Sequence, residues 1–298
     1  MYLATFNYND SQKIGVLTKE KSFIIPMDEI FKKLKRNTPK NMTDFIENFD
    51  DNLLKEISSI IENKDLLKIS INDVDIKAPI PYPKKNIICL GKNYLDHVEE
   101  IKGLTTKETS IPKLPIYFSK IANPCIGQYD LIRNHSNITN HIDYEVELAI
   151  IIGKKGSNIK RSEVKDYIFG FSIANDITAR NLQKEHIQWL RGKSLDTFCP
   201  MGPYLVHKSV IPFPVELNIE CKVNGEIRQS SNTKNMIFNI PYIVSDISKG
   251  ITLEPGDIIL TGTPSGVGLG FKPPKYLKSG DTVECNIEKI GTLVNKVK

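Results

Sequence analysis

The stretch from Glu145 to Ile152 constrains the fold more than any other part of the sequence, because the apolar run Leu148–Ile152 directly follows the alternating acids Glu145 and Glu147. An uninterrupted apolar run of this length indicates a largely buried strand. Side chains two residues apart on a strand point to the same face, so both acids are expected to project together near its start. A membrane-spanning helix needs about 20 apolar residues, and the sequence predicts none.

The composition is that of an ordinary globular protein. Of the 298 residues, 40% are hydrophobic and 25% are charged, which excludes a disordered chain, a collagen-like fibre and a disulfide scaffold. The net charge of +5 is spread along the chain, and its densest basic stretch, residues 32–36, is interpreted as a solvated helix face, so we expect no nucleic-acid partner. The five cysteines form no C-x-x-C pair and residues 1–13 lack the pattern of a secretory signal, so we expect a cytoplasmic protein.

Three prolines, Pro79, Pro81 and Pro83, stop regular structure and stiffen the backbone, and they predict a domain boundary. Before them the sequence predicts a small N-terminal α/β domain over residues 1–78. Its expected strands are residues 13–18, 22–25 and 74–77, and its expected helices are residues 27–36 and 44–62.

The second predicted domain, residues 86–298, carries many short strands and few helices. Its expected strands are residues 86–90, 115–119, 144–152, 169–174, 204–207, 217–223, 257–261, 282–287 and 292–297. Helices are expected at residues 94–101, 177–190 and 241–249. Because strands and helices do not alternate strictly, a doubly wound parallel sheet is disfavoured, and the sequence predicts an α+β fold that is mainly β.

The paired acids point to a metal site. Two carboxylates side by side repel each other, and burying them without a partner is unfavourable, whereas a hard divalent cation takes their oxygens as ligands. Asp176 follows another apolar strand and is a candidate third ligand, and three carboxylates suit Mg²⁺ or Mn²⁺ with positions left for a chelating substrate. The alternatives are an exposed strand face for Glu145 and Glu147 and a helix N-cap for Asp176.

Three further segments carry candidate chemistry. On a helix, His97 and Glu100 face the same way, which suits a general acid–base pair, although a surface histidine beside an acid has the same spacing. Lys193 lies among small and apolar residues and is a candidate for stabilising enolate or carboxylate charge, with an exposed lysine as the alternative. The Gly-rich turn around Thr263 offers backbone N–H groups and a hydroxyl to a carboxylate, or is only a tight turn.

Taken in order, these segments resemble the fumarylacetoacetate hydrolase family across residues 86–298. The matching motifs are GKNYLDHVEE, PIYFSK, DYEVELAIIIG, FGFSIANDITARNLQ, GKSLDTFCPMGP, VNGEIRQSSNTKNMIF and GDIILTGTPSGVG. The N-terminal region and the ending GFKPPKYLKSGD are similar to a bacterial subgroup with oxaloacetate decarboxylase activity. The resemblance implies a mixed β-sandwich roll with short helices, a small N-terminal domain and a homodimer.

The resemblance also implies a metal site and an acid–base pair. Glu145, Glu147 and Asp176 match the family's three carboxylate ligands, which hold Mg²⁺ or Mn²⁺. His97 and Glu100 fall on the family's mobile lid as its catalytic pair.

Five other positions match residues that handle the substrate. Lys193 matches the active-site lysine, and Thr263 matches the threonine whose turn contacts the substrate carboxylate. Lys120, Arg180 and Gln183 match polar pocket residues that bind substrate.

The chain departs from the family pattern at Asn181, where many relatives carry Asp, and the segment 102–110 after the lid helix is difficult to align. Both features bear on substrate preference rather than on the ligand set.

The predicted chemistry is that of a 2-oxo acid that chelates the metal and reacts through a metal-stabilised enolate. Oxaloacetate decarboxylation and acylpyruvate C–C hydrolysis are the leading hypotheses. An isomerase or hydrolase of aromatic catabolism, acting on a compound such as 2-hydroxyhepta-2,4-diene-1,7-dioate, is an alternative. A catalytically idle module that binds a 2-oxo acid or a protein is the remaining one.

Overall fold

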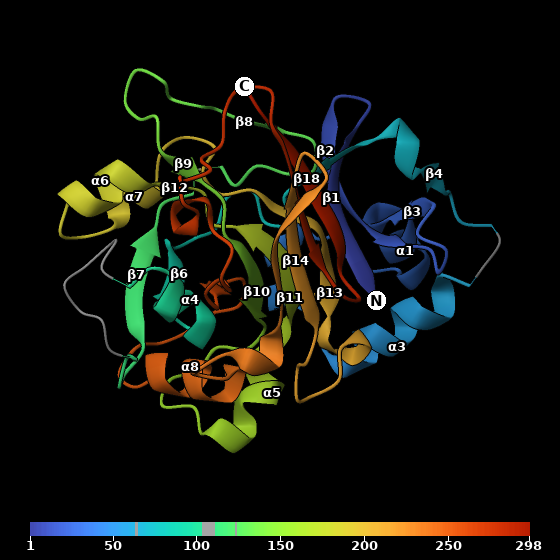
Figure 1. Cartoon of the computed structure of the whole chain (residues 1–298). Coiled ribbons are helices and arrows are strands. Elements are labelled where there is room, and N and C mark those ends of the chain that lie inside the picture. Colours follow the sequence, from blue (N-terminus) through green and yellow to red (C-terminus); the bar gives the residue numbers. More distant parts are fainter. Residues whose placement is uncertain (63–64, 103–110, 123) are drawn as a thin grey trace.

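The computed structural model describes residues 1–62, 65–102, 111–122 and 124–298, and strands dominate it (Figure 1). The largest sheet in these residues has eleven strands in the order β4-β3-β2-β1-β13-β11-β10-β16-β6-β7, with β5 paired to β1. Its strands are β1 (Tyr2–Tyr8), β2 (Ser11–Leu17), β3 (Phe23–Pro26), β4 (Ile69–Ser70), β5 (Asp75–Lys77), β6 (Ile87–Gly91), β7 (Ile116–Lys120), β10 (Val146–Ile152), β11 (Ile168–Asn175), β13 (Met201–His207) and β16 (Ile258–Leu260).

A second, five-stranded sheet packs against one face of the large sheet. Its order is β15 (Glu226–Asn232), β14 (Asn218–Val223), β17 (Thr282–Ile287), β18 (Gly291–Val297) and β8 (Leu131–Ile132). Strands β9 (Ile142–Asp143) and β12 (Thr178–Ala179) form a separate two-stranded ladder. Figure 1 shows β14 and β18 lying over β10, β11 and β13, which makes this part of the molecule a sandwich of two sheets.

The helices lie outside the sandwich of the two sheets (Figure 1). They are α1 (Met27–Leu34), α2 (Met42–Glu47), α3 (Asp51–Ile60), α4 (Leu95–Glu100), α5 (Val164–Tyr167), α6 (Arg180–Glu185), α7 (Leu190–Lys193) and α8 (Ile240–Ile247). Within the described ranges, no helix combines the length and apolar character needed to cross a membrane.

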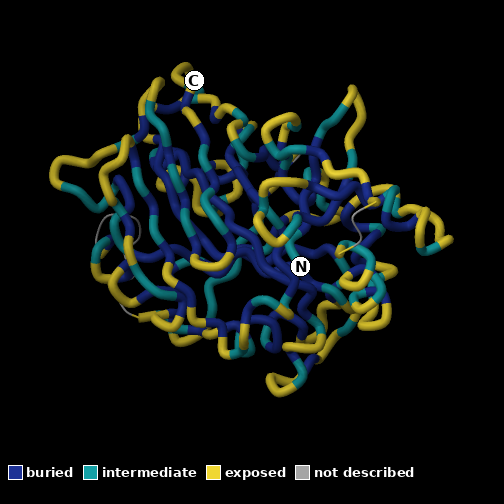
Figure 2. Tube along the Cα trace, turned by 90° about the vertical axis from the view of Figure 1, so that its right-hand side faces the viewer, coloured by how far each residue is buried: buried dark blue, intermediate teal, exposed yellow. Residues whose placement is uncertain are grey.

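Strand β10 lies at the centre of the protein, and all seven of its residues are buried. Alternate side chains enter different cores: Leu148 and Ile150 pack into the core between the two sheets, whereas Ala149 and Ile151 pack into the core covered by α1, α2 and α3. The predicted buried strand is therefore confirmed, and it is buried because each face of the sheet has its own cover. Figure 2 shows the buried segments running through the middle of the molecule, with the exposed segments at its rim.

Two predicted helices are wrong in their extent. The helix expected at residues 44–62 is two helices, because Asp50 leaves the helical conformation and accepts a hydrogen bond from the Leu53 N–H as the N-cap of α3. The helix expected at residues 177–190 begins only at Arg180, because Thr178 and Ala179 pair with β9, and its first part ends at Glu185. Strand β15 was not predicted, because its sequence EIRQSSN lacks an apolar alternation.

The mainly β, mixed fold is confirmed, and its N-terminal strands continue the large sheet. Strand β1 pairs antiparallel with β13, and the Thr5 hydroxyl donates to the Pro79 carbonyl at 2.7 Å. This pairing places residues of both predicted domains in one sheet. The division into domains 1–78 and 86–298 stays a prediction.

His207, at the end of β13, predicts a pH-dependent stability. Burial, the Met1 ammonium and Lys208 lower the pKa of His207 from 6.5 to about 4. Between these values the unfolded chain binds a proton that the folded chain excludes, so stability is unaffected above pH 6.5 and falls as the pH drops towards 4. The protonation of His207 lowers the free energy of unfolding of the wild-type by about 3 kcal/mol between pH 7 and 4. In His207→Gln this contribution to the pH dependence is absent.

Urea unfolding across this range measures the effect. His186→Gln, at an exposed position, is the control and keeps the wild-type pH dependence. Parallel stability curves for wild-type and His207→Gln would contradict the prediction.

Candidate active site

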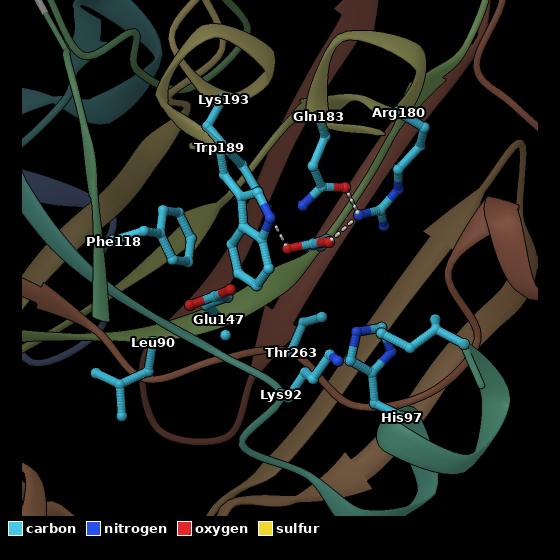
Figure 3. Close-up of a pocket in the computed structure, with 13 residues that line it drawn as sticks. Leu90, Lys92, His97, Phe118, Glu147, Arg180, Gln183, Trp189, Lys193 and Thr263 are labelled. Carbon is cyan, nitrogen blue, oxygen red and sulfur yellow. Dashed lines mark hydrogen bonds and ion pairs between the residues drawn. The ribbon is translucent and has the colours of Figure 1, made fainter. Parts of the chain in front are cut away.

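A cavity opens where strand β16 leaves strand β10. The two strands pair only from Ala149 to Ile151, and beyond Leu260 the chain turns away at Gly262, whose φ is +91°. A positive φ of this size favours glycine. The cavity is small, with a volume of about 30 Å³ (Figure 3). Its lining residues are Leu90, Gly91, Lys92, His97, Ile101, Phe118, Glu145, Glu147, Arg180, Gln183, Trp189, Lys193 and Thr263.

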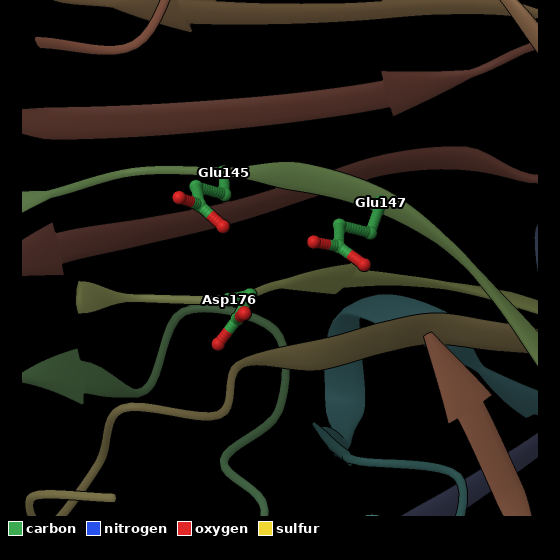
Figure 4. A group of neighbouring side chains, drawn as sticks. All are labelled: Glu145, Glu147 and Asp176. Carbon is green, nitrogen blue, oxygen red and sulfur yellow. The ribbon is translucent and has the colours of Figure 1, made fainter. Parts of the chain in front are cut away.

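Three buried carboxylates lie together at this point. Strands β10 and β11 are antiparallel with Val146 opposite Asn175, so the start of one meets the end of the other. Asp176 therefore lies beside Glu145, and its N–H donates to the Glu145 carbonyl at 2.9 Å. Oxygens of Glu145, Glu147 and Asp176 all lie within 4.8 Å of one another. Figure 4 shows Glu145 and Glu147 projecting from the same side of β10, as the alternation of side chains predicts.

Two buried cations neutralise part of this charge. The Lys193 ammonium lies 2.7 Å from Glu145 Oε2 and 2.6 Å from Asp176 Oδ2, and Arg180 Nη1 lies 2.7 Å from Glu145 Oε1. Burial by itself raises the pKa of the Glu145 carboxyl, but the charges of Lys193 and Arg180 outweigh burial and lower this pKa to about 2. The same carboxylates raise the pKa of the Lys193 ammonium against the effect of its burial. Glu145 and Lys193 are therefore charged at neutral pH.

Glu147 is in a different electrostatic position. Its Oε2 accepts a hydrogen bond from the Gly262 N–H at 2.7 Å, and it forms no ion pair with the residues the structure describes. Burial, followed by repulsion from Asp176 and Glu145, raises its pKa well above the usual value. A divalent cation among these oxygens would remove that penalty, and an all-oxygen donor set is the kind that Mg²⁺ and Mn²⁺ prefer. The residues present therefore fit such an ion.

His97, on α4, lines the same cavity, and Glu100 lies beside it on that helix. His97 Nδ1 lies 3.2 Å from Glu100 Oε2, and the other oxygen of Glu100 accepts a hydrogen bond from the Gly266 N–H at 2.8 Å. Ser265 donates to Asp96 at 2.7 Å, so α4 is held to the Gly-rich turn at two points one helical turn apart. A carboxylate only accepts hydrogen bonds, which assigns the ring proton to Nδ1 and leaves the lone pair on Nε2.

Arg180 and Gln183, on α6, also meet at the cavity. Arg180 Nε donates to Asp143 Oδ2 at 2.8 Å, and Nη1 donates to Gln183 Oε1 at 3.1 Å. The remaining nitrogen, Nη2, is buried and has no hydrogen-bond partner among the described residues. Asn181, the position that departs from the family pattern, does not line the cavity and accepts a hydrogen bond from Thr139 at 2.6 Å.

Two predicted substrate-binding groups are placed differently from the rest. Lys120 lies behind Asp176, outside the cavity lining, and its ammonium donates to Asp176 Oδ1 at 2.6 Å, to the Ile177 carbonyl and to the Lys193 carbonyl. All three of its N–H groups are used within the protein, so this geometry supports the Asp176 carboxylate rather than a substrate. The Thr263 hydroxyl donates its proton to the Val146 carbonyl at 2.9 Å, so only backbone N–H groups of the turn remain for a carboxylate.

Sequence reasoning missed several residues that shape the site. Asp143 accepts hydrogen bonds from the N–H groups of Tyr144, Gly268 and Leu269 and orients Arg180, yet nothing in its spacing distinguishes it from a solvated acid. Phe118 and Trp189, the only tryptophan of the chain, form an apolar wall with ring centroids 5.1 Å apart. Most of the predicted lid segment, residues 103–110, lies outside the described residues.

Comparison with known proteins identifies the family. Residues 86–298 match the family model described as fumarylacetoacetate (FAA) hydrolase C-terminal. The chain belongs to the fumarylacetoacetate hydrolase family. The resemblance inferred from the motifs is therefore confirmed. Oxaloacetate tautomerase YisK of Bacillus subtilis (strain 168), a curated relative, is 53% identical over 228 residues, which cover 76% of this chain and 74% of that protein.

Solved structures of the family share the whole architecture. The fumarylacetoacetate hydrolase of psychrophilic Exiguobacterium antarcticum is 37% identical with a TM-score of 0.83, covering 100% of this chain and 99% of that one. Maleylpyruvate hydrolase of Sphingobium sp. SYK-6, solved with manganese(II) and pyruvate, is 27% identical with a TM-score of 0.78, covering 100% and 98%. The relatives of this fumarylacetoacetate hydrolase family member thus include enzymes named as tautomerase and hydrolase.

The raised pKa of Glu147 predicts that binding of Mn²⁺ or Mg²⁺ releases a proton, because the cation and the proton compete for the same oxygens. The affinity for the cation should therefore rise with pH until the pH exceeds the pKa of Glu147. Calorimetric titration in two buffers of different ionisation enthalpy measures the released proton.

Variants sharpen this test. Glu147→Gln should weaken binding and abolish the buffer dependence, Glu145→Gln and Asp176→Asn should lose binding, and the exposed control Glu20→Gln should behave as wild-type. Wild-type binding heats that do not depend on the buffer would refute the prediction.

Proposed function

We propose that this chain is a Mg²⁺- or Mn²⁺-dependent enzyme that interconverts the enol and keto forms of oxaloacetate. The observation that supports the proposal is one small cavity lined by Glu145, Glu147 and His97. Asp176 lies beside the two glutamates, and Glu100 is hydrogen-bonded to His97. The 53% identical relative is named an oxaloacetate tautomerase, which supports the choice of substrate. The manganese(II) and pyruvate in the Sphingobium structure support a metal and a 2-oxo acid.

Glu145, Glu147 and Asp176 would hold the ion, and Lys193 and Lys120 would keep Glu145 and Asp176 in place. When bound, the cation would polarise the C2 oxygen of the substrate and favour negative charge there. The protein's own groups then have to orient the substrate and move one proton.

Arg180 is the group best placed to orient an anionic substrate. Its Nη2 is a buried donor without a partner among the described residues, and leaving such a donor unpaired is unfavourable. A substrate carboxylate would satisfy it. Backbone N–H groups of the turn at Thr263 are candidates for the second carboxylate, since its hydroxyl proton is already donated to Val146. Two anion contacts at one site suit a dicarboxylate.

His97 would transfer the proton at C3. In the keto-to-enol direction, Nε2 takes a proton from C3, the C2=O bond becomes C2–OH with a proton from water, and a C2=C3 bond forms. The hydroxide left from that water then takes the proton from Nε2 and restores the neutral ring. In the reverse direction a proton passes from Nε2 to C3, and the C2–OH proton returns to water. Glu100 holds the ring in the required tautomer and stabilises the imidazolium that forms.

Oxaloacetate decarboxylation and acylpyruvate hydrolysis are second candidates because they share the enolate of a 2-oxo acid. Decarboxylation breaks the C3–C4 bond instead of the C3–H bond, and hydrolysis adds water at the distal carbonyl. The 37% identity to the Exiguobacterium hydrolase favours testing hydrolysis directly.

A product-resolved assay separates these reactions. Oxaloacetate, acetylpyruvate and fumarylpyruvate are incubated with metal-free and with Mg²⁺- or Mn²⁺-loaded protein and followed by proton NMR and CO₂ release. A tautomerase accelerates loss of the oxaloacetate enol and exchange at C3 in D₂O without releasing CO₂, and EDTA stops it. Pyruvate and CO₂ would instead identify a decarboxylase, and acetate and pyruvate a hydrolase. Thermal stabilisation by oxalate without any turnover would identify an idle binding module.

The acid–base role of His97 predicts a specific loss. His97→Ala should slow turnover by about 10²–10⁴-fold, the usual contribution of general acid–base catalysis, while Mn²⁺ affinity is kept. The exposed His186→Ala is the matched control and should retain wild-type rates. Unchanged C3 exchange in His97→Ala would remove this residue from the mechanism.

A further inference from the structure

Gln229, on the edge strand β15 of the five-stranded sheet, makes a polar connection to the candidate active site. Its side chain is fully buried, and its amide crosses to β10 of the large sheet. Oε1 accepts a hydrogen bond from the Val146 N–H at 3.0 Å. Nε2 donates to the Thr263 hydroxyl and to the Pro264 carbonyl, both at 2.8 Å.

The position of Val146 explains why these contacts matter. Strand β16 pairs with β10 only as far as Ala149, so the outward backbone groups of Val146 have no strand beside them. Gln229 takes the Val146 N–H, and the Thr263 hydroxyl takes the Val146 carbonyl at 2.9 Å. Two side chains thus replace a strand ladder at the residue between Glu145 and Glu147, and buried backbone groups must be paired in some such way.

The same amide locates the Gly-rich turn. The amide holds Thr263 and Pro264. The backbone next to Gln229 also packs against Gly266, where an added Cβ would overlap the Arg228 carbonyl. Gly266 has a φ of +102°, and its N–H donates to Glu100, which in turn orients His97. The turn, the acids and the catalytic pair therefore share one anchor.

A β-bulge aims Gln229 inward. Cys221 lies opposite Gln229 and Lys222 lies opposite Ile227, which leaves Arg228 as the extra residue on β15. Bulges bend a strand and redirect its side chains, often next to a functional site.

We infer that Gln229 is a positioning residue for the active site, which acts through Thr263 and its turn rather than by touching substrate. The inference deepens the proposed function, but it is tested by binding and by amide exchange, so that its failure can be distinguished from failure of the proposed reaction.

The test compares two buried amides. Gln229→Met removes the contacts to Val146, Thr263 and Pro264 with little change of volume. Asn295→Leu is the matched control, because Asn295 is 2% exposed and its Nδ2 donates to two carbonyls, of Gly127 and Asp130, that do not line the cavity. Both variants should have a lower melting temperature than wild-type, because each removes buried hydrogen bonds. The melting temperature therefore measures the effect on stability and not the effect on the site.

The functional readout is the affinity for Mn²⁺ with oxalate, measured by calorimetry. Gln229→Met should weaken it at least tenfold, within the 10–100-fold typical of residues that support a metal site indirectly, and Asn295→Leu should stay within twofold of wild-type. Thr263→Val removes the hydroxyl that hydrogen-bonds to both Gln229 and Val146, and it replaces Gln229→Met in this test if that variant does not fold. The double variant, Gln229→Met with Thr263→Val, should bind no more weakly than the weaker-binding of the two single variants, because both substitutions disrupt the same hydrogen-bond network.

Amide exchange supplies a readout that needs no ligand. Exchange of residues 261–270 and of α4 should accelerate at least tenfold in Gln229→Met and should be unchanged in Asn295→Leu. Wild-type affinity and wild-type exchange in Gln229→Met would overturn the inference, as would equal losses in Asn295→Leu or multiplicative losses in the double variant. Wild-type protein that binds Mn²⁺ and oxalate but leaves oxaloacetate unchanged would contradict the proposed function alone.

Discussion

The burial of three carboxylates within 4.8 Å of one another is the constraint on which the rest of this structure depends. Such a cluster is unfavourable unless positive charge and hydrogen-bond donors surround it. Lys193, Lys120 and Arg180 supply most of that charge, and each of them is itself buried and paired with one or more of the acids. The acids and the basic groups of the site therefore stabilise one another. Glu147 forms no ion pair with the described residues, so it is the carboxylate whose charge a bound cation would balance.

The fold makes room for this set by letting two strands separate. β16 leaves β10 at Leu260, and the cavity lies at the start of β10, lined by Glu145, Glu147 and Thr263. Because the strands separate, backbone groups of β10 lose a partner strand. Side chains from the second sheet and from the turn form hydrogen bonds with these groups instead. The sandwich of two sheets thus has a local role at the site, because β15 lies close enough for Gln229 to reach across.

Much of the site could be predicted from local patterns. The acids on β10 share a face because strand side chains alternate, and His97 and Glu100 meet because they are three residues apart on a helix. Lys120 shows the limit of such reasoning. A matching motif places it near the substrate, but its ammonium is fully used by Asp176 and two carbonyls, and this becomes visible only when distant segments are packed together. Gln229 and Asp143 carry no local signal, because the partners that give them a role at the site, Val146 and Thr263 for Gln229 and Arg180 for Asp143, are distant in the sequence.

The sequence by itself determined the family, the mainly β architecture, the central buried strand and the acids that lie along it, because each depends on spacing between neighbouring residues or on motifs in a fixed order. The tertiary structure alone decided which charges are paired, which donor stays unpartnered, and which polar side chains complete the backbone where two strands part. Those outcomes depend on contacts between segments that are distant in the sequence, from 17 residues for Lys193 and Asp176 to 115 for Glu147 and Gly262, and local periodicity carries no information about them.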